Sequence, residues 1–155
     1  MTQLHPHLAV RPAAAPAQTH AKLNEVFSSF QGEGLHVGRW EMFIRFNLCN
    51  LHCGYCDTPE SLVPQTQWQW HRPGQKEFEA RTNPVSVEEL GAALAEQDRL
   101  GGPHAAVNLT GGEPLLQHEF LREFLPTQAG RFSFSLETNG TNPDALRSVL
   151  PVAVL

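Results

Sequence analysis

Strand-forming and helix-forming segments alternate along this chain, and this order constrains the fold more than any other feature of the sequence. Strand patterns occupy residues 41–47, 105–109 and 131–137, and helix patterns begin at Ser86, at residue 117 and at Asn142. Strands that alternate with helices form parallel sheets through right-handed crossovers. The sequence therefore predicts an α/β fold built on a parallel sheet.

Local signals mark the ends of these helices. Ser86 and Glu89 have the Ser-x-x-Glu spacing of a capping box, and the Gly101-Gly102-Pro103 segment stops the helix that follows. Asn142 precedes a proline, which is tolerated in the first turn of a helix because its missing N–H needs no partner there. Both helices are therefore expected to start and stop close to these residues.

The remaining segments predict less regular structure. Residues 1–21 are rich in proline and alanine and are expected to form a disordered tail, so that the folded domain covers residues 22–155. Residues 60–84 are expected to form a long irregular loop, because prolines punctuate them. Residues 152–155 look like the start of another strand.

Composition excludes several classes of protein. Apolar residues make up 41% of the chain and charged residues 17%, which favours a globular protein. Acidic residues outnumber basic ones by 16 to 11, which argues against direct binding of nucleic acid. The sequence shows neither an apolar run of membrane-spanning length nor a signal peptide, so we expect a cytoplasmic protein that does not enter the membrane.

An unusual motif follows each of the three predicted strands. Cysteines follow the first strand, Thr110-Gly-Gly-Glu-Pro114 follows the second, and Glu137-Thr-Asn-Gly140 ends the third. In open α/β sheets, ligands bind at the carboxyl ends of the strands. The sequence therefore predicts one site to which all three motifs contribute.

Cys49, Cys53 and Cys56 are the only cysteines, and they lie too close together in the chain to form a disulfide framework. A structural zinc site needs four protein ligands, whereas an iron–sulfur cluster held by three cysteines leaves one iron free for another ligand. The three-cysteine spacing favours the cluster. Zinc is the alternative, with His52 or His36 as the fourth ligand.

The cysteine motif, with Tyr55 before its last member, resembles the signature of the radical S-adenosylmethionine (SAM) superfamily, as does the Gly-Gly-Glu segment at residues 111–113. A longer ordered set of segments is similar to the 7-carboxy-7-deazaguanine synthase family. That set is Gln31-Gly-Glu-Gly34, Phe43-Ile-Arg-Phe46, Cys49-Asn-Leu51, Tyr55-Cys-Asp-Thr58, Leu109-Thr-Gly-Gly-Glu-Pro114-Leu-Leu-Gln117 and Glu137-Thr-Asn-Gly-Thr141.

This resemblance implies a partial α/β barrel of the radical SAM type. It implies conversion of 6-carboxy-5,6,7,8-tetrahydropterin to 7-carboxy-7-deazaguanine with loss of ammonia, a step in queuosine biosynthesis. It also implies a 4Fe-4S cluster, SAM and Mg²⁺ as cofactors, an electron donor such as flavodoxin or ferredoxin, and a homodimer. The family has further C-terminal segments that this chain lacks, so we expect a barrel truncated at its C-terminus, whose open edge a partner chain covers if the chain is not a fragment.

The resemblance also assigns roles to individual residues. It places Cys49, Cys53 and Cys56 on the cluster, Tyr55, Cys56, Asp57 and Gly112 against SAM, and Thr58 on Mg²⁺. It places Phe30, Gln31, Gly32, Glu33, Arg45 and Thr110 on the substrate, with Arg45 on the substrate carboxylate. The chemistry itself is left to the radical derived from SAM, so no catalytic side chain is assigned.

Three of these residues have plain structural alternatives. Arg45 could form a salt bridge with Glu33 or Glu41, Thr58 could cap a turn, and Gly112 could be required by a close approach of two backbone segments. Two alternatives exist for the whole protein. One is an activase of glycyl-radical enzymes in the same superfamily, and the other is a non-enzymatic zinc-binding α/β module.

Overall fold

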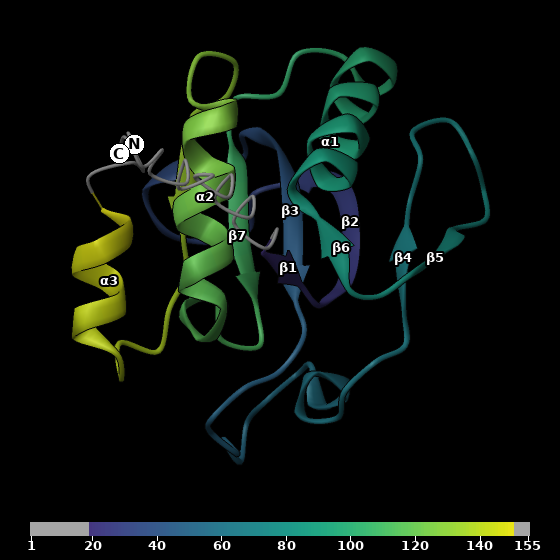
Figure 1. The fold of residues 1–155 in the computed structure, drawn as a ribbon. Coiled ribbons are helices and arrows are strands. Elements are labelled where there is room, and N and C mark those ends of the chain that lie inside the picture. Colours follow the sequence, from purple (N-terminus) through teal and green to yellow (C-terminus); the bar gives the residue numbers. More distant parts are fainter. Residues whose placement is uncertain (1–18, 151–155) are drawn as a thin grey trace, which may run out of the picture.

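The structure is a computed structural model that describes residues 19–150 (Figure 1). Its strands are β1 (His20–Ala21), β2 (Leu23–Phe30), β3 (Trp40–Phe46), β4 (Gln67–Trp70), β5 (Glu79–Thr82), β6 (Val85–Ser86), β7 (Val107–Gly111) and β8 (Phe134–Leu136). The α-helices are α1 (Val87–Gly101), α2 (His118–Gln128) and α3 (Pro143–Val149), and the 3₁₀ helices are η1 (Gly34–His36), η2 (Pro59–Leu62) and η3 (Pro114–Gln117).

The main sheet has six strands in the order β5-β4-β2-β3-β7-β8, while β1 and β6 form a separate antiparallel pair. Strands β3, β7 and β8 are parallel neighbours, which confirms the predicted parallel arrangement for the three strands identified from sequence. Strand β2 is antiparallel to β3 and parallel to β4, and β5 is antiparallel to β4. The complete sheet is therefore mixed.

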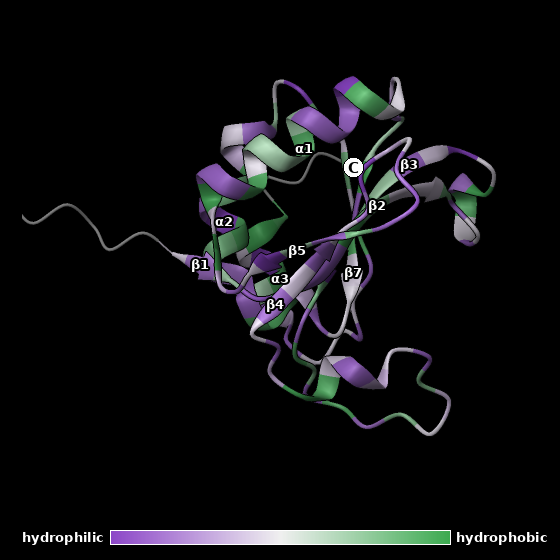
Figure 2. Cartoon of the chain, turned by 90° about the vertical axis from the view of Figure 1, so that its right-hand side faces the viewer, coloured by the Kyte–Doolittle hydropathy of each residue, from purple (hydrophilic) through white to green (hydrophobic). Residues whose placement is uncertain are grey.

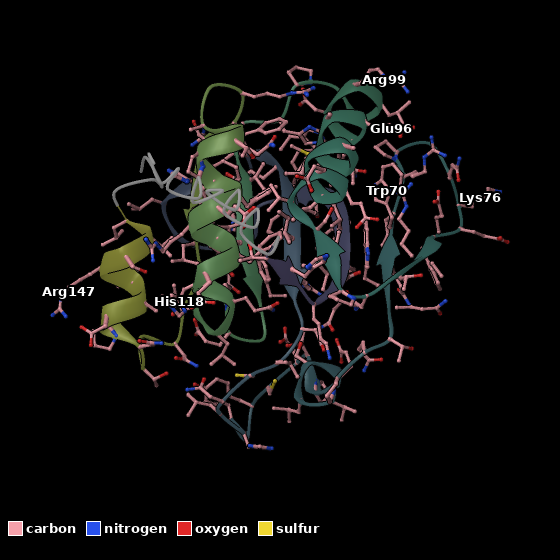
Figure 3. All side chains as sticks on the ribbon, viewed as in Figure 1. Trp70, Lys76, Glu96, Arg99, His118 and Arg147 are labelled. Atoms are coloured by element: carbon pink, nitrogen blue, oxygen red, sulfur yellow. The ribbon has the colours of Figure 1, made fainter. Side chains whose placement is uncertain are left out.

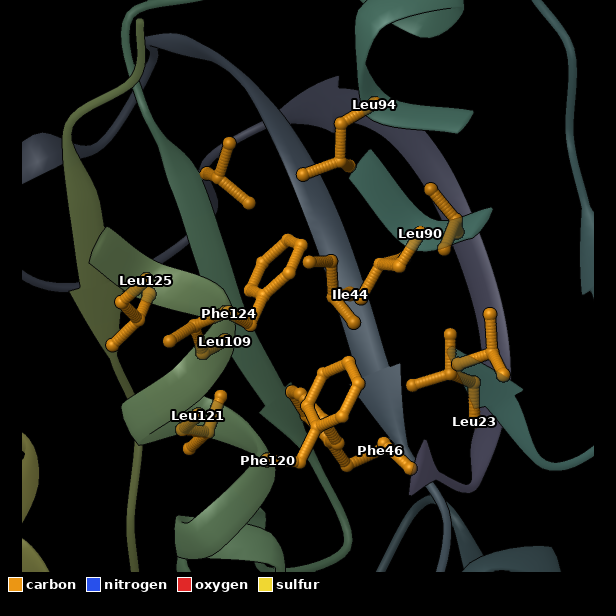
Figure 4. Close-up of a cluster of buried hydrophobic side chains, with 14 of the residues drawn as sticks. Leu23, Ile44, Phe46, Leu90, Leu94, Leu109, Phe120, Leu121, Phe124 and Leu125 are labelled. Carbon is orange, nitrogen blue, oxygen red and sulfur yellow. The ribbon is translucent and has the colours of Figure 1, made fainter. Parts of the chain in front are cut away.

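The helices pack against one face of this sheet, so the core lies between helices and strands (Figures 1, 2 and 4). Met42, Ile44 and Phe46 alternate along β3 and are fully buried in this core. The intervening residues Phe43 and Arg45 point to the opposite face, because successive side chains of a strand alternate. Figure 4 shows the helix side of the core, including Leu23, Ile44, Phe46, Leu90, Leu94, Leu109, Phe120, Leu121, Phe124 and Leu125.

The predicted helix boundaries are confirmed by their caps. Glu89 N donates to Ser86 Oγ at 3.2 Å and Ser86 N donates to Glu89 Oε2 at 2.9 Å, which is the complete capping box. Helix α1 ends at Gly101, and Gly102 follows with a φ of 84°. At α3, Ala145 N donates to Asn142 Oδ1 at 3.1 Å.

The prediction of an irregular loop over residues 60–84 is wrong. This segment contains η2, β4 and β5, and Trp68 and Trp70 are 2% and 0% exposed. Prolines suggested a loop, but those at 64, 73 and 84 lie outside the two strands. Within β4 the alternation of tryptophan and glutamine buries one side of the strand, and that period-two signal outweighs the flanking prolines.

The predicted tail, residues 1–21, extends too far into the chain, because β1 already forms at His20–Ala21. No local pattern predicts β2, because its alternation is interrupted where the pairing with β3 shifts register between Leu23 and Glu25. The rest of the predicted tail, residues 1–18, and the predicted strand at residues 152–155 lie outside the described residues.

A chain of buried and partly buried hydrogen bonds joins β4, α1 and β2. Trp70 Nε1 donates to Gln97 Oε1 at 2.7 Å, and Gln97 Nε2 donates to Ser28 Oγ at 2.8 Å. Ser28 Oγ also lies 2.8 Å from His104 Nε2, and His104 Nδ1 lies 3.0 Å from Asp98 Oδ1. These bonds satisfy polar groups that would otherwise be buried without partners.

We predict that Trp70→Ala lowers the free energy of unfolding by about 3–5 kcal/mol, because it removes a fully buried ring and leaves Gln97 without its donor. Gln67→Ala on the exposed side of the same strand is the control and should change stability by less than about 0.5 kcal/mol. Urea unfolding of the metal-free chain measures both. Equal small effects would mean that β4 is not part of the core.

Candidate active site

The three predicted motifs meet at one edge of the sheet. The cysteine loop follows β3, the Gly-Gly-Glu segment follows β7, and residues 137–141 follow β8. In Figure 1 the loop after β3 extends below the strand ends, and in Figure 3 yellow sulfur atoms mark it. The turn after β7 is bonded to the end of β3, since Gly112 N donates to Phe46 O and Glu113 N to Leu48 O, both at 2.9 Å.

The close contact between these two backbone segments explains why positions 111 and 112 are both glycine. Gly111 has a φ of 105°, and a Cβ on Gly112 would lie 2.1 Å from the carbonyl oxygen of Leu48. Any other residue at position 112 would force the two backbones apart. The structural alternative for Gly112 is therefore confirmed, while a contact with SAM remains a prediction.

The sequence assigns no role to the side chain of Glu113. In the structure this side chain braces the site, because it links the Gly-Gly-Glu segment to the segment after β8 by hydrogen bonds. Its carboxylate is 1% exposed and accepts hydrogen bonds from Leu115 N at 2.9 Å, Thr138 Oγ1 at 2.8 Å and Asn139 N at 2.7 Å. Two of these donors belong to the segment after β8. An acidic residue directly between glycine and proline, with apolar residues beyond, was the available sequence signal.

Two further side-chain contacts connect the cysteine loop to the segment after β8. Asn50 Nδ2 donates to Thr141 Oγ1 at 2.9 Å, and Asn139 Nδ2 donates to Asn50 Oδ1 at 3.0 Å. At the base of the loop, Asn47 is fully buried and its Nδ2 donates to Val63 O at 3.0 Å. The loop is thus bonded to the sheet and to its neighbour, which fixes where the cysteines lie.

The three cysteines line one cavity of about 180 Å³ and form no disulfide. Its lining is Cys49, Leu51, Cys53, Tyr55, Cys56, Asp57, Thr58, Ser61, Leu62, Gly111, Gly112 and Asn139, which includes all four residues predicted to contact SAM. Cys49 and Cys53 are half-buried and Cys56 is exposed.

The metal-ligating side chains of this cavity fit an iron–sulfur cluster better than a single zinc ion. Within residues 19–150, no three His, Cys, Asp or Glu side chains lie close enough together to hold one metal ion. The thiols instead surround a shared space, and neither His36 nor His52, the candidate fourth zinc ligands, lines it. Three thiolates around a cavity suit a multi-iron cluster with one open iron.

A second cavity, of about 290 Å³, adjoins the first and contains all six residues predicted to bind substrate. Its lining is Phe27, Ser29, Phe30, Gln31, Gly32, Glu33, Phe43, Arg45, Asp57, Thr58, Thr110, Gly111 and Glu137. Asp57, Thr58 and Gly111 line both cavities. A ligand in one cavity would therefore be next to a ligand in the other.

Thr58 lies at the junction and is 9% exposed. It precedes η2, but its side chain makes no capping hydrogen bond, so the cap alternative is wrong. Its hydroxyl instead lies 3.8 Å from Cys56 Sγ. The hydroxyl oxygen is therefore not occupied by the helix terminus.

Arg45 does form a salt bridge, but not with either predicted partner. Its Nη1 lies 2.7 Å from Glu25 Oε1, and its guanidinium stands over the ring of Phe27 at 5.1 Å from the ring centre. Glu33 and Glu41, the partners expected from sequence, do not pair with it in the described structure. Arg45 is the sole basic side chain among the residues that line the larger cavity.

Glu137 is the second residue that the sequence left without a role. Its carboxylate accepts from Thr110 Oγ1 at 2.6 Å and from Asn108 Nδ2 at 2.8 Å, and it lines the larger cavity. Gln31 is oriented in a similar way, since Glu33 N donates to Gln31 Oε1 at 3.0 Å. The cavity thus presents fixed acceptors and donors, together with one guanidinium.

The Radical SAM superfamily model matches residues 43–153, and the chain belongs to that family. Within it the chain is similar to 7-carboxy-7-deazaguanine synthases: 44% identical over 132 residues to that of Geobacter sulfurreducens and 38% over 137 residues to that of Thermococcus kodakarensis. These alignments cover 84% and 83% of this chain and 52% and 53% of the relatives. The chain thus spans about half the length of these relatives.

A solved structure described as QueE from Escherichia coli is similar in fold as well, with a TM-score of 0.57 and 27% identity over 79% of this chain and 53% of that one. The predicted radical SAM fold is confirmed. Family membership implies a 4Fe-4S cluster and SAM, so the zinc-module alternative is wrong. None of the helices in residues 19–150 is long and apolar enough to cross a membrane.

We predict that Glu113→Gln destabilises the chain by about 1–3 kcal/mol, because the amide NH₂ would face one of the donors that the carboxylate now accepts from. Anaerobic reconstitution should also give less iron per chain, since the brace holds the site together. Glu77→Gln, at an exposed position, is the matched control. Unchanged unfolding and iron content in Glu113→Gln would contradict the bracing role.

Proposed function

We propose that this chain carries the active site of a 7-carboxy-7-deazaguanine synthase, which converts 6-carboxy-5,6,7,8-tetrahydropterin to 7-carboxy-7-deazaguanine with loss of ammonia. The observation that carries the proposal is the pair of adjoining cavities, one lined by three thiols and the other by polar groups around a single guanidinium. The named relatives, all called 7-carboxy-7-deazaguanine synthases, support the same reaction and disfavour the glycyl-radical activase.

In the smaller cavity, Cys49, Cys53 and Cys56 hold the cluster, and Tyr55, Cys56, Asp57 and Gly112 contact SAM. When bound, these cofactors would supply the radical chemistry that begins the reaction. The role of the protein is to hold the reacting groups side by side. The shared lining at Asp57 and Gly111 supports this arrangement, because it leaves no separate wall between the two ligands.

In the larger cavity, the substrate ring lies against Phe30, Gln31, Gly32, Glu33 and Thr110, and its carboxylate pairs with Arg45. The donors and acceptors of an aminopyrimidine ring need partners when water is excluded, since each unpaired group costs about 1–3 kcal/mol. The carboxylates of Glu33 and Glu137 line the cavity and suit ring N–H groups. Arg45 suits a carboxylate because a guanidinium can donate two parallel hydrogen bonds.

The proposal includes Mg²⁺ held by the hydroxyl of Thr58. Magnesium prefers hard oxygen ligands and shares itself between few protein groups and the substrate. The carboxylate of Asp57 lines the same cavity, so the junction is rich in oxygen. The hydroxyl of Thr58 makes no capping hydrogen bond, which supports this assignment.

We extend the proposal to the setting of the enzyme. It acts in the cytoplasm as a homodimer and receives electrons from a small donor such as flavodoxin or ferredoxin. The folded domain that carries this chemistry includes β1 (His20–Ala21), so it begins before residue 22.

The decisive experiment is anaerobic reconstitution with iron and sulfide, followed by incubation with the carboxytetrahydropterin, SAM, Mg²⁺ and a reductant. We expect visible absorption that a reductant bleaches, which Cys53→Ala abolishes, and formation of the deazaguanine product and ammonia. Radical cleavage of SAM with no conversion of the pterin would contradict the substrate assignment. A colourless, iron-free protein would contradict the cluster as well.

Arg45→Lys tests the carboxylate contact. Lysine keeps the charge but cannot donate two parallel hydrogen bonds. We therefore expect KM for the substrate to rise about tenfold, which corresponds to the loss of one charge-assisted hydrogen bond. Cleavage of SAM in the absence of substrate should persist. If both activities fall equally, Arg45 has a structural role instead.

Thr58→Ala tests the magnesium site. Without the hydroxyl, the chain loses an oxygen ligand, so the Mg²⁺ concentration needed for half-maximal activity should rise about tenfold or more. Iron content should be unchanged, because the cysteines remain. An unaltered response to added Mg²⁺ would refute the role of Thr58.

A further inference from the structure

Glu25 and Arg45 face each other directly across β2 and β3. They are register partners in the antiparallel pair, and Arg45 Nη1 donates to Glu25 Oε1 at 2.7 Å. Their side chains are 20% and 33% exposed, so this is a partly buried ion pair rather than a surface one. Such a pair holds its geometry more firmly than a solvated one.

The second oxygen of Glu25 lies near the residue that follows another strand. His71 directly follows β4, its backbone N donates to Val26 O at 2.9 Å, and its Nε2 lies 3.0 Å from Glu25 Oε2. The ring of His71 lies between the rings of Phe27 and Phe78, at 6.2 and 5.6 Å from their centres. Glu25 thus lies between Arg45, to which it is hydrogen-bonded, and a packed imidazole that it approaches without a hydrogen bond.

Phe27 restrains the guanidinium from a third direction. Its ring stacks on that of Phe43 at 5.1 Å between ring centres, and the guanidinium of Arg45 lies over its face. Glu25 occupies one nitrogen of Arg45, whereas a guanidinium carries five N–H donors. Donors are therefore left over for a ligand.

The two members of the pair face different spaces. Arg45 lines the larger cavity, whereas Glu25 is absent from its lining and lines a separate depression with Asn24, Glu60, Gln65, Gln67 and Gln69. Glu33, Asp57 and Glu137 line the cavity together with Arg45. Without an anchor behind it, the guanidinium would be drawn toward these three carboxylates and away from an incoming anion.

We propose that Glu25, which His71 flanks, is a positioning residue that keeps the guanidinium of Arg45 aimed at a ligand carboxylate and away from the carboxylates of the cavity. This inference rests on the proposed function, because it takes the carboxylate to be that of the pterin. Glu25 does not touch the ligand and acts only through Arg45.

The experiment compares two stable fluorescent probes, pterin-6-carboxylate and pterin, which differ only in the carboxylate. The ratio of their dissociation constants measures what the carboxylate contributes to binding. We expect Glu25→Ala to reduce this contribution about tenfold, and Glu25→Gln to reduce it less, because glutamine keeps one acceptor oxygen for Arg45. The control is Glu79→Gln, which removes a carboxylate from another arginine pair, with Arg81, outside the larger cavity.

The two probes separate this role from the alternatives. A merely structural role would weaken both probes equally and leave the ratio unchanged. If Glu25 acts only by repelling anions, its removal would strengthen binding of the carboxylate probe. Either result overturns the proposal, and the Glu25→Gln variant, which keeps the shape of the side chain, decides the matter if Glu25→Ala does not fold.

A second measurement needs no ligand. In NMR spectra of the ¹⁵N-labelled chain, the guanidinium protons of Arg45 should exchange slowly in the wild type and at least tenfold faster in Glu25→Gln, because the charged acceptor is lost. Equal exchange in both would overturn the positioning role. If the wild type binds neither pterin while this difference is present, the proposed substrate is wrong and the positioning of Arg45 stands.

Discussion

The site depends on one close approach between backbones, in which the turn after β7 lies against the end of β3. Gly112 and Glu113 donate to Phe46 O and Leu48 O, and the missing Cβ of Gly112 makes the approach possible. Through this contact the cysteine loop is fixed relative to β7. The carboxylate of Glu113 accepts hydrogen bonds from the segment after β8, so all three motifs are connected to one another. A cluster held by a single loop needs such support, because the loop alone has no buried core of its own.

The same strands serve two purposes, because their side chains alternate between faces. Facing the helices, β3 and β7 present apolar residues such as Ile44 and Leu109, which form the core. Facing away, a polar row crosses β2, β3 and β7 and ends at the residue after β8: Glu25 pairs with Arg45, Arg45 stands in register with Thr110, and Thr110 donates to Glu137. Each member of the row is positioned by the core on the other face, so the packing of the helices determines the geometry of the cavity.

The sequence predicted those features that depend on neighbours in the chain. The capping box at Ser86, the parallel strands and the placement of the three motifs at strand ends follow from local patterns. The partner of Arg45 does not, because Glu25 lies 20 residues away on a strand whose alternation is interrupted. Trp68 and Trp70 were misassigned for a related reason: their burial depends on α1 and β2, and the surrounding prolines gave the stronger local signal.

The buried polar groups beside the sheet are not all paired. Facing the helices, Gln97 and Ser28 have partners in the chain that joins Trp70 to Asp98. On the other face, Glu41 Oε1, Asn108 Oδ1 and Ser135 Oγ are buried without a hydrogen-bond partner among the described residues. Each such atom costs about 1–3 kcal/mol when water is excluded, a cost that the apolar side of the sheet has to offset. These three atoms lie on the side of the sheet that carries Arg45, Thr110 and Glu137. The free energy of burying the core on the other side therefore offsets the cost of a polar face that is able to bind a polar ligand.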